Sequence, residues 1–541
     1  MFNVEIIHKN VSCDLEINQK KMGERKMSFM NAVKNTLNED FNYSVTENGA
    51  LGYRTTGKEL VDLNFAVSSM RGMSEESIYN KFTKAYFEDK MMALRWLFFA
   101  RDVRGGLGER RLFRVILKNM AKDDPDIVKK LTPLVSEYGR YDDLWCLFGT
   151  DVDGVILDII KKQLTDDIEN MANNKPVSLL AKWLPSVNAS STKTKMDARY
   201  ICKNLGMTER EYRKTLSSLR SYIDIVEGKM SAKKWGDIKY ETVPSRANLI
   251  YNGAFLRNDE ERRREYLSKL EKGETKINAG TLFPHDIVHK YSSITGGSGV
   301  VNKYDATLES LWKALPDTVN ECGNTIVVAD GSGSMCCNVG ADNRVAAIEV
   351  ANALAIYFAE HSSGDFKYKY ITFSSRPQLV DFSQCDSLRD KLRVAYRHNE
   401  CSNTNIEKVF DLILTTAVNG HMKQKDMPKN VLIISDMEFD SCATCGGSDG
   451  WGLNRPSARL FDVIKKRFNA AGYQMPRLVF WNVNSRTGTI PVKENDFGVA
   501  LVSGFSTNVC KMVMSGKTDP YECLVETLMS ARYDAVEAAL R

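Results

Sequence analysis

The sequence predicts two consecutive folded parts: an α-helical repeat domain over residues 51–315 and a doubly wound α/β domain over residues 320–541. Residues 1–50 are mixed and polar and are interpreted as an N-terminal extension. Residues 64–312 contain many amphipathic runs with helical spacing and few strand signals. After Gly323, short β-branched runs alternate with helical runs, which is typical of βαβ units and a mostly parallel sheet covered on both faces.

The first part is built from helical runs separated by brief polar breaks. Examples of these runs are residues 90–99, 110–120 and 151–164, and the breaks at 104–108 and 122–125 contain Gly or Pro. Gly and Pro interrupt helices, so these breaks predict turns. Helices of this length joined by short turns predict a HEAT-like solenoid of stacked helical pairs, although the sequence has no strict repeat period.

The second part is predicted to alternate strands with helices. Apolar runs rich in β-branched residues predict strands at residues 325–329, 367–373, 431–435, 478–483 and 499–502. Runs with helical periodicity predict helices at residues 344–361, 406–418, 457–470 and 520–540.

A group of oxygen-bearing side chains falls at the carboxyl ends of these strands, where open parallel sheets bind ligands. Asp330, Ser332 and Ser334 follow the run 325–329; Thr404 precedes the helical run 406–418, and Asp436 follows the run 431–435. Carboxylates and hydroxyls are hard ligands that suit Mg²⁺, or Mn²⁺ or Ca²⁺, rather than a soft metal. The D-x-S-x-S pattern with this Thr and Asp resembles the metal-ion-dependent adhesion site of a von Willebrand A domain. That resemblance implies that Ser332 and Ser334 ligate the ion directly.

Other interpretations of the same loop are weaker. A Ser-rich turn with Asp330 as a solvated surface acid would explain the pattern without a metal. A nucleophile elbow and a dinucleotide loop both fail on spacing, and no Walker A loop occurs. His285 and His289 have helical i,i+4 spacing without an evident third metal ligand, which favours a structural role. The sequence therefore predicts a protein that is not an enzyme, and a hydrolase built on Asp330 and Asp436 remains a minor alternative.

The composition is that of an ordinary globular protein, with 43% hydrophobic and 26% charged residues among 541. No apolar run approaches the ~20 residues of a membrane span, and the N-terminus lacks a signal sequence. Twelve irregularly spaced cysteines favour reduced thiols and a cytoplasmic location. From residue 320 onward there are 24 Lys and Arg against 25 Asp and Glu, so the net charge of +5 lies in the first part, which carries +6.

Cysteines form a second candidate cluster near the metal loop. Cys336 and Cys337 follow Ser334, and Cys442 and Cys445 form a C-x-x-C after Asp436. C-x-x-C is half of a typical zinc site. Unpaired reduced thiols are the simpler interpretation, and the sequence leaves both open.

Short phrases along the chain identify a resemblance to a family of uncharacterised proteins that join a helical domain to a von Willebrand A domain. The phrases lie at residues 101–106, 108–111, 138–145, 182–186, 211–214, 243–247, 283–286, 435–439 and 480–483. The family is similar in architecture to the Ro autoantigen (TROVE-module) ribonucleoproteins. In those proteins the helical repeats close into a ring that the A domain fastens, and the ring binds structured or misfolded RNA.

The resemblance implies an RNA-binding face on the helical part. The basic residues that could form it are Lys182, Lys193, Lys195, Arg199, Lys203, Arg210, Arg213, Lys214 and Arg220, with Tyr212 and Tyr222 among them as possible stacking groups. A solvated helix face is the alternative, because Glu209, Glu211 and Asp224 interleave the same positions.

The expected function is thus that of a cytoplasmic, non-enzymatic RNA-binding scaffold with a divalent cation and no membrane partner. The alternative is a protein–protein interaction module whose metal ion binds an acidic side chain of a partner.

Overall fold

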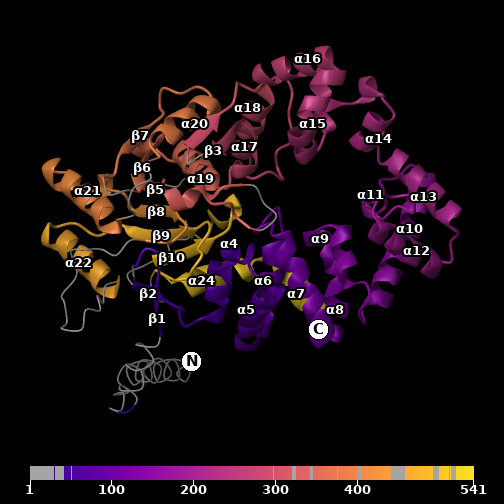
Figure 1. The fold of residues 1–541 in the computed structure, drawn as a ribbon, viewed down its shortest axis with the longest axis horizontal. Coiled ribbons are helices and arrows are strands. Elements are labelled where there is room, and N and C mark those ends of the chain that lie inside the picture. Colours follow the sequence, from indigo (N-terminus) through magenta and orange to yellow (C-terminus); the bar gives the residue numbers. More distant parts are fainter. Residues whose placement is uncertain are drawn as a thin grey trace, which may run out of the picture. The chain divides into compact units, whose positions relative to one another are not determined.

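The computed structural model describes residues 30, 42–49, 51–295, 298–319, 324–340, 345–373, 376–399, 405–439, 457–491, 499–510, 512 and 519–541. By its contacts the chain divides into residues 1–44 and residues 45–541. The larger unit contains a helical part followed by an α/β sheet region, as the sequence predicts (Figure 1). Ahead of the helices lie the short strands β1 (Tyr43–Val45) and β2 (Leu51–Tyr53).

The helical part runs from residue 59 to residue 313. Its helices are α3 (Glu59–Phe65), α4 (Val67–Met70), α5 (Glu75–Glu88), α6 (Lys90–Arg101), α7 (Arg110–Asp123), α8 (Pro125–Leu131), α9 (Val135–Tyr138), α10 (Asp153–Ala172), α11 (Leu180–Trp183), α12 (Thr192–Asn204), α13 (Glu209–Tyr222), α14 (Val226–Ser231), α15 (Ser245–Asn258), α16 (Glu260–Glu271), α17 (Pro284–Tyr291) and α18 (Ala306–Lys313). An antiparallel hairpin of β3 (Ser292–Thr295) and β4 (Ser298–Val301) separates the last two helices.

Local sequence signals explain where these helices begin. The Asp89 side chain accepts a hydrogen bond from the Met92 amide at the start of α6. Thr208 and Glu211 form a reciprocal capping box at the start of α13. Such caps satisfy amides that have no partner within the helix. Within α5, which the Ser74 side chain caps, Ile78, Phe82 and Ala85 are buried at helical spacing and form one apolar face.

The α/β region contains a six-stranded sheet in the order β10-β9-β8-β5-β6-β7, parallel except for β7. Its strands are β5 (Thr325–Asp330), β6 (Lys369–Phe373), β7 (Leu379–Asp381), β8 (Asn430–Ser435), β9 (Arg477–Asn482) and β10 (Val499–Ser503). Nearly every consecutive residue of β8, β9 and β10 is buried. Because consecutive residues point to opposite faces, both faces of the sheet are covered.

The helices of this region are α19 (Ala347–His361), α20 (Leu388–Arg397), α21 (Ile406–Asn419), α22 (Ser457–Ala470), α24 (Pro520–Leu528) and α25 (Asp534–Leu540). The sequence prediction of one helix over 520–540 is wrong, because a turn at Ala531–Tyr533 divides it. The Leu528 carbonyl accepts a hydrogen bond from the Arg95 guanidinium at 3.0 Å, and Arg532 and Tyr533 turn toward Asp102. At the break between α24 and α25, the chain therefore makes its hydrogen bonds with the helical part.

Both ends of the helical part pack on the α/β region. At the first end, α3 contacts β10, and α24 and α25 contact α6. At the other end, α17 contacts α19 and α18 contacts α20. The helices therefore follow a path that leaves the sheet region and returns to it (Figure 1).

Asp102 is the main polar contact at the first end. Its carboxylate, 1% exposed, accepts hydrogen bonds from Arg532 Nη2 at 2.9 Å and from the Tyr533 hydroxyl at 3.2 Å. Gly106 lies in the turn that follows Asp102, and its carbonyl accepts a hydrogen bond from the Ser506 hydroxyl at 2.7 Å. Gly106 has no room for a side chain, because a Cβ there would lie 1.9 Å from the Phe99 carbonyl oxygen. The phrase at residues 101–106 thus forms a joint between the two parts.

Two other buried carboxylates join the second end. Glu309 of α18 accepts hydrogen bonds from the first two amides of α20, those of Leu388 and Arg389, at 2.8 and 3.1 Å. Glu349 of α19 lies 3.0 Å from His289 Nδ1 and accepts a hydrogen bond from the Ser292 hydroxyl at 3.2 Å. A carboxylate at a helix start is favoured by the helix dipole, so Glu309 both caps α20 and attaches α18 to it.

None of the helices within the described ranges has the length and apolar character needed to cross a lipid bilayer.

We expect Asp102→Ala to lower the free energy of unfolding by about 3 kcal/mol, because charged hydrogen bonds to Arg532 and Tyr533 are lost at a buried position. Asp126→Ala is the matched control, since Asp126 is largely exposed and its ion pair is with Lys129 on the same helix; its effect should stay within about 0.5 kcal/mol. Urea denaturation followed by circular dichroism measures both. Equal stability of the two variants would contradict the role of Asp102 as a joint.

Candidate functional site

The strand order places two carboxylates side by side. The chain first adds strands β6 and β7 on one side of β5, and it then adds β8, β9 and β10 on the other side. The direction in which strands are added therefore reverses between β5 and β8. Ligands of open α/β sheets bind at such a reversal, beyond the carboxyl ends of the strands. Asp330 is the last residue of β5, and Asp436 directly follows the last residue of β8.

Asp330, Ser332, Ser334 and Asp436 surround this point. The Asp330 carboxylate accepts hydrogen bonds from the Ser332 amide at 2.9 Å and from the Ser435 hydroxyl at 2.6 Å. The Ser332 and Ser334 hydroxyl oxygens lie 2.9 Å apart. Asp330 and Asp436 are each only 1% exposed, which contradicts the interpretation of Asp330 as a solvated surface acid. Thr404, the remaining predicted ligand, lies outside the described residues.

The electrostatics of the two carboxylates fit a divalent cation. Burial and the neighbouring negative charge of Asp436 raise the pKa of Asp330 to about 7. Burial also raises the pKa of Asp436, although a Ser334 hydrogen bond and the positive Arg486 oppose the shift. Asp436 Oδ2 is buried and lies 3.3 Å from Arg486 Nη1. A cation bound between the two groups would favour their charged forms.

Three residues beside these carboxylates were not predicted from the sequence. Arg486 Nη1 lies 3.3 Å from Asp436 Oδ2, and Arg486 Nε donates to a carboxylate oxygen of Glu47 at 2.7 Å. Buried Glu438 accepts hydrogen bonds from the amides of Glu47 and Arg486, both at 2.8 Å. Glu438 therefore positions the guanidinium beside Asp436. Only its place two residues after Asp436 marks it in the sequence.

The predicted cysteine cluster is only partly described. Cys336 is half-buried and Cys337 is exposed. Cys442 and Cys445 lie outside the described residues, so zinc binding by these four residues stays a prediction. Among the residues that the structure does describe, no three or more His, Cys, Asp or Glu side chains are grouped to hold a metal ion. The Asp330 site is not a group of this kind, because two of its four described oxygen-bearing side chains are the hydroxyls of Ser332 and Ser334.

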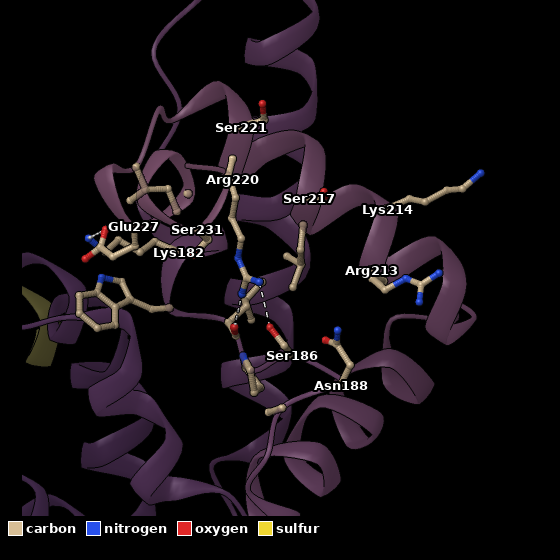
Figure 2. Close-up of a pocket in the computed structure, with 18 of the residues that line it drawn as sticks. Lys182, Ser186, Asn188, Arg213, Lys214, Ser217, Arg220, Ser221, Glu227 and Ser231 are labelled. Carbon is tan, nitrogen blue, oxygen red and sulfur yellow. Dashed lines mark hydrogen bonds and ion pairs between the residues drawn. The ribbon is translucent and has the colours of Figure 1, made fainter. Parts of the chain in front are cut away.

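Some of the predicted basic residues line a cavity in the helical part. This basic cavity has a volume of about 1170 Å³ and is lined by α11, α13, α14 and the segments beside them (Figure 2). Four of the predicted residues line it: Lys182, Arg213, Lys214 and Arg220. Lys234 also lines it and is a cation that the sequence analysis did not select.

Some of these cations are bound by the protein itself. Arg220 donates to the Ala181 and Leu184 carbonyls and to the Ser186 hydroxyl at 2.7–2.9 Å, which makes it a structural residue. Lys182 lies 3.8 Å from Glu227, and Arg199 donates to Glu209 at 3.0 Å.

Tyr212 has no free ring face, because it is fully buried with its hydroxyl on the Pro185 carbonyl. The prediction that Tyr212 stacks on bases is therefore wrong. Tyr222 is partly exposed, and its hydroxyl donates to the Lys175 carbonyl.

Other cations remain available to a ligand. They are exposed and form no ion pair with any described residue: Lys193, Lys203, Arg210, Arg213, Lys214 and Lys234. Lys195 is half-buried. In Figure 2 the Arg213 and Lys214 side chains extend from α13 without the dashed contacts that hold Arg220 and Lys182.

The acidic residues that interleave these positions have other partners. Glu211 caps α13 through Thr208, and Asp224 pairs with Lys229 at 2.8 Å. They therefore leave the positive charge of Arg213 and Lys214 uncompensated.

Comparisons with known proteins give families without an assigned function. Residues 324–535 match the domain of unknown function DUF7788, and residues 202–325 match the domain of unknown function DUF2828. The chain is 29% identical over 527 residues to the uncharacterized protein L728 of Acanthamoeba polyphaga mimivirus, a match that covers 90% of this chain and 87% of that protein. Among solved structures, it is similar to the RO (RSR) protein of Deinococcus radiodurans. That match has 13% identity and a TM-score of 0.44, and it covers 79% of this chain and 92% of that one.

We expect Asp330→Ala to abolish binding of Mn²⁺ or Mg²⁺ while the chain stays folded, because the substitution removes a buried carboxylate whose charge is unfavourable without a cation. Isothermal titration calorimetry measures binding, and circular dichroism checks the fold. Asp365→Ala, at an exposed position of the same region, should bind like the parent. If Asp330→Ala binds the ion as the parent does, Asp330 is not a ligand.

Proposed function

We propose that this chain is a non-enzymatic, cytoplasmic RNA-binding scaffold. In this proposal the helical part is a HEAT-like solenoid that closes on a von Willebrand A domain, and that domain holds a divalent cation, Mg²⁺ by preference. The observation that carries the proposal is the basic cavity, where Arg213, Lys214 and Lys234 have no acidic partner among the described residues.

The lining of the basic cavity suits the backbone of a nucleic acid. Cations that lack a protein partner bind phosphates by releasing counterions, which gives affinity without sequence preference. Hydroxyl and amide side chains stand among the cations, from Ser186, Asn188, Ser217, Ser221 and Ser231. Such groups hydrogen-bond to sugars and phosphates. A volume of about 1170 Å³ also exceeds the usual size of a small-molecule pocket.

The ligand is expected to be RNA recognised by shape rather than by sequence. Tyr212 is buried, and the partly buried Trp183 already has the Arg140 guanidinium over its ring at 4.1 Å. With little exposed aromatic surface in the cavity, base stacking contributes less than phosphate and sugar contacts. Structured or misfolded RNA, which presents folded backbone and 2′-hydroxyls, fits this chemistry.

The cation site completes the scaffold. Asp330, Asp436, Ser332 and Ser334 would hold the ion, with Thr404 as the remaining predicted ligand. A bound Mg²⁺ with few protein ligands keeps coordination positions for water or for an anionic oxygen. The non-enzymatic part of the proposal rests on the sequence, which has no nucleophile elbow and no phosphate-binding loop.

A second candidate function is a protein–protein interaction module. It is favoured by Arg486, whose guanidinium lies beside Asp436 and is about one-third exposed. A metal ion and this guanidinium together would attract an acidic side chain of a partner protein.

We expect the quadruple variant Lys193→Glu, Arg213→Glu, Lys214→Glu, Lys234→Glu to bind a structured RNA at least tenfold more weakly than the parent. The dependence of affinity on salt should also become less steep, because each lost phosphate contact removes roughly one unit of the slope. Fluorescence anisotropy at several salt concentrations measures both quantities.

The matched control carries the same charge change in the α/β region: Lys408, Lys423, Lys425 and Lys429, all exposed, each replaced by Glu. This control should retain most of the affinity and should bind Mn²⁺ normally. Equal RNA affinity of the two quadruple variants would show that RNA binds elsewhere. No RNA affinity in the parent at low salt would favour the protein-interaction module.

A further inference from the structure

A second cavity lies where the helical part meets the α/β region. It has a volume of about 380 Å³, within the usual range of small-molecule sites. Residues of α15 and α17 line it, together with Arg71, Gly108 and Val345. Its walls thus come from the beginning of the helical part, from its later helices and from Val345, two residues before α19. We refer to it as the joint cavity.

Three of the sequence phrases meet here. Residues 108–111 supply Gly108, residues 243–247 supply Arg246, and residues 283–286 supply Phe283, His285 and Asp286. Gly108 has a φ of +73°, and a Cβ there would lie 2.8 Å from the Phe283 ring. A side chain at position 108 would therefore displace a wall of the cavity.

The polar side of the joint cavity carries three cationic side chains, those of Arg71, Arg246 and Lys290, together with the Asp286 carboxylate. Arg246 donates through Nη1 to Asp286 at 2.7 Å, and its side chain is 62% exposed, so a ligand can reach it. Lys290 is exposed and forms no ion pair with any described residue. Arg71 is bound by Glu109 and stacks on the Phe505 ring at 3.7 Å. Arg246 and Lys290 are thus the cations that a ligand can engage.

His285 adds a buried group without a partner. Its ring is 6% exposed, stacks on Phe283 and packs edge-on against Phe505. Nδ1 of this ring is buried and has no hydrogen-bond partner among the described residues, whereas His289 Nδ1 is used by Glu349. Burial lowers the pKa of His285 to about 4, so the ring is neutral at pH 7. A buried polar atom left unpaired is costly, and a bound ligand would relieve that cost.

The remaining lining is apolar. Ile250, which is 56% exposed, Leu249, Val345 and the Phe283 ring provide a surface suited to a flat or apolar group. A ligand that matches the whole cavity carries an anionic head for Arg246 and Lys290 and an aromatic or apolar body.

We propose that the joint cavity binds a small phosphate monoester with an aromatic body, of the nucleoside monophosphate class. The phosphate oxygens contact Arg246 and Lys290, His285 Nδ1 hydrogen-bonds to the ligand, and the base lies on Phe283 and Ile250. An Arg fork and a Lys ammonium are the usual protein groups for phosphate. Binding here is separate from RNA binding at the basic cavity, because the two cavities share no residue.

The test titrates AMP, inorganic phosphate and adenosine into the full-length chain by isothermal titration calorimetry. We expect AMP to bind saturably at one site, phosphate to compete with it, and adenosine to bind at least tenfold more weakly. Arg246→Glu combined with Lys290→Glu should abolish AMP binding. The control, Lys272→Glu combined with Lys276→Glu, changes exposed lysines outside the cavity and should bind AMP like the parent.

A third variant tests the contribution of His285 Nδ1 to binding without creating a cavity at this position. His285→Phe retains an aromatic ring against Phe505 and removes Nδ1, and we expect AMP affinity to fall about tenfold. A 5′-phosphorylated tetraribonucleotide distinguishes the source of the phosphate. If AMP binds more tightly than this oligonucleotide, the site is assigned to free nucleotides. If the oligonucleotide binds more tightly, the same phosphate contacts are assigned to the end of an RNA strand. Absence of AMP and phosphate binding in the parent, or unchanged AMP binding in the Arg246 and Lys290 double variant, would overturn the proposal.

Discussion

Three buried carboxylates, Asp102, Glu309 and Glu349, hold the helical part to the α/β region at both of its ends. Each accepts hydrogen bonds from the other part of the chain or from a helix start. A buried carboxylate that loses its donors is strongly unfavourable, so neither end separates without a large cost. The helices between these two contacts are therefore fixed at both ends. The cavities that these helices line depend on the same contacts.

The two candidate sites have opposite charge and select different ligands. At the sheet, Asp330 and Asp436 bring two carboxylates together, and burial raises the pKa of both. In the helical part, Arg213, Lys214 and Lys234 bring positive charge together without acidic partners among the described residues. This matches the charge distribution along the sequence, with the positive excess before residue 320. A cation at the sheet would also weaken its repulsion of a polyanion.

Elements that depend on local pattern were predicted from the sequence. Strands β5, β8 and β9 follow from apolar β-branched runs, and the convergence of Asp330 and Asp436 follows from a parallel sheet whose strand ends meet at one edge. The prediction of a helical part followed by an α/β region is confirmed.

Features set by distant contacts were not predictable in this way. Arg486 reaches Asp436 only because Glu438 holds the amides of Arg486 and Glu47, which are far apart in the sequence. Helical spacing placed Arg220 on the same face as Arg213, but nothing in the pattern reveals that Arg220 binds the Ala181 and Leu184 carbonyls. The break between α24 and α25 likewise depends on Asp102, more than four hundred residues away.

The central claim, that RNA contacts the basic cavity, is tested most directly by photo-crosslinking. A structured RNA containing 4-thiouridine would be irradiated with the full-length chain, and the crosslinked peptides would be identified by mass spectrometry. The structure predicts crosslinks concentrated between residues 182 and 237, the limits of the cavity lining, and their loss at high salt. Crosslinks concentrated after residue 320, or crosslinks that resist high salt, would contradict the account.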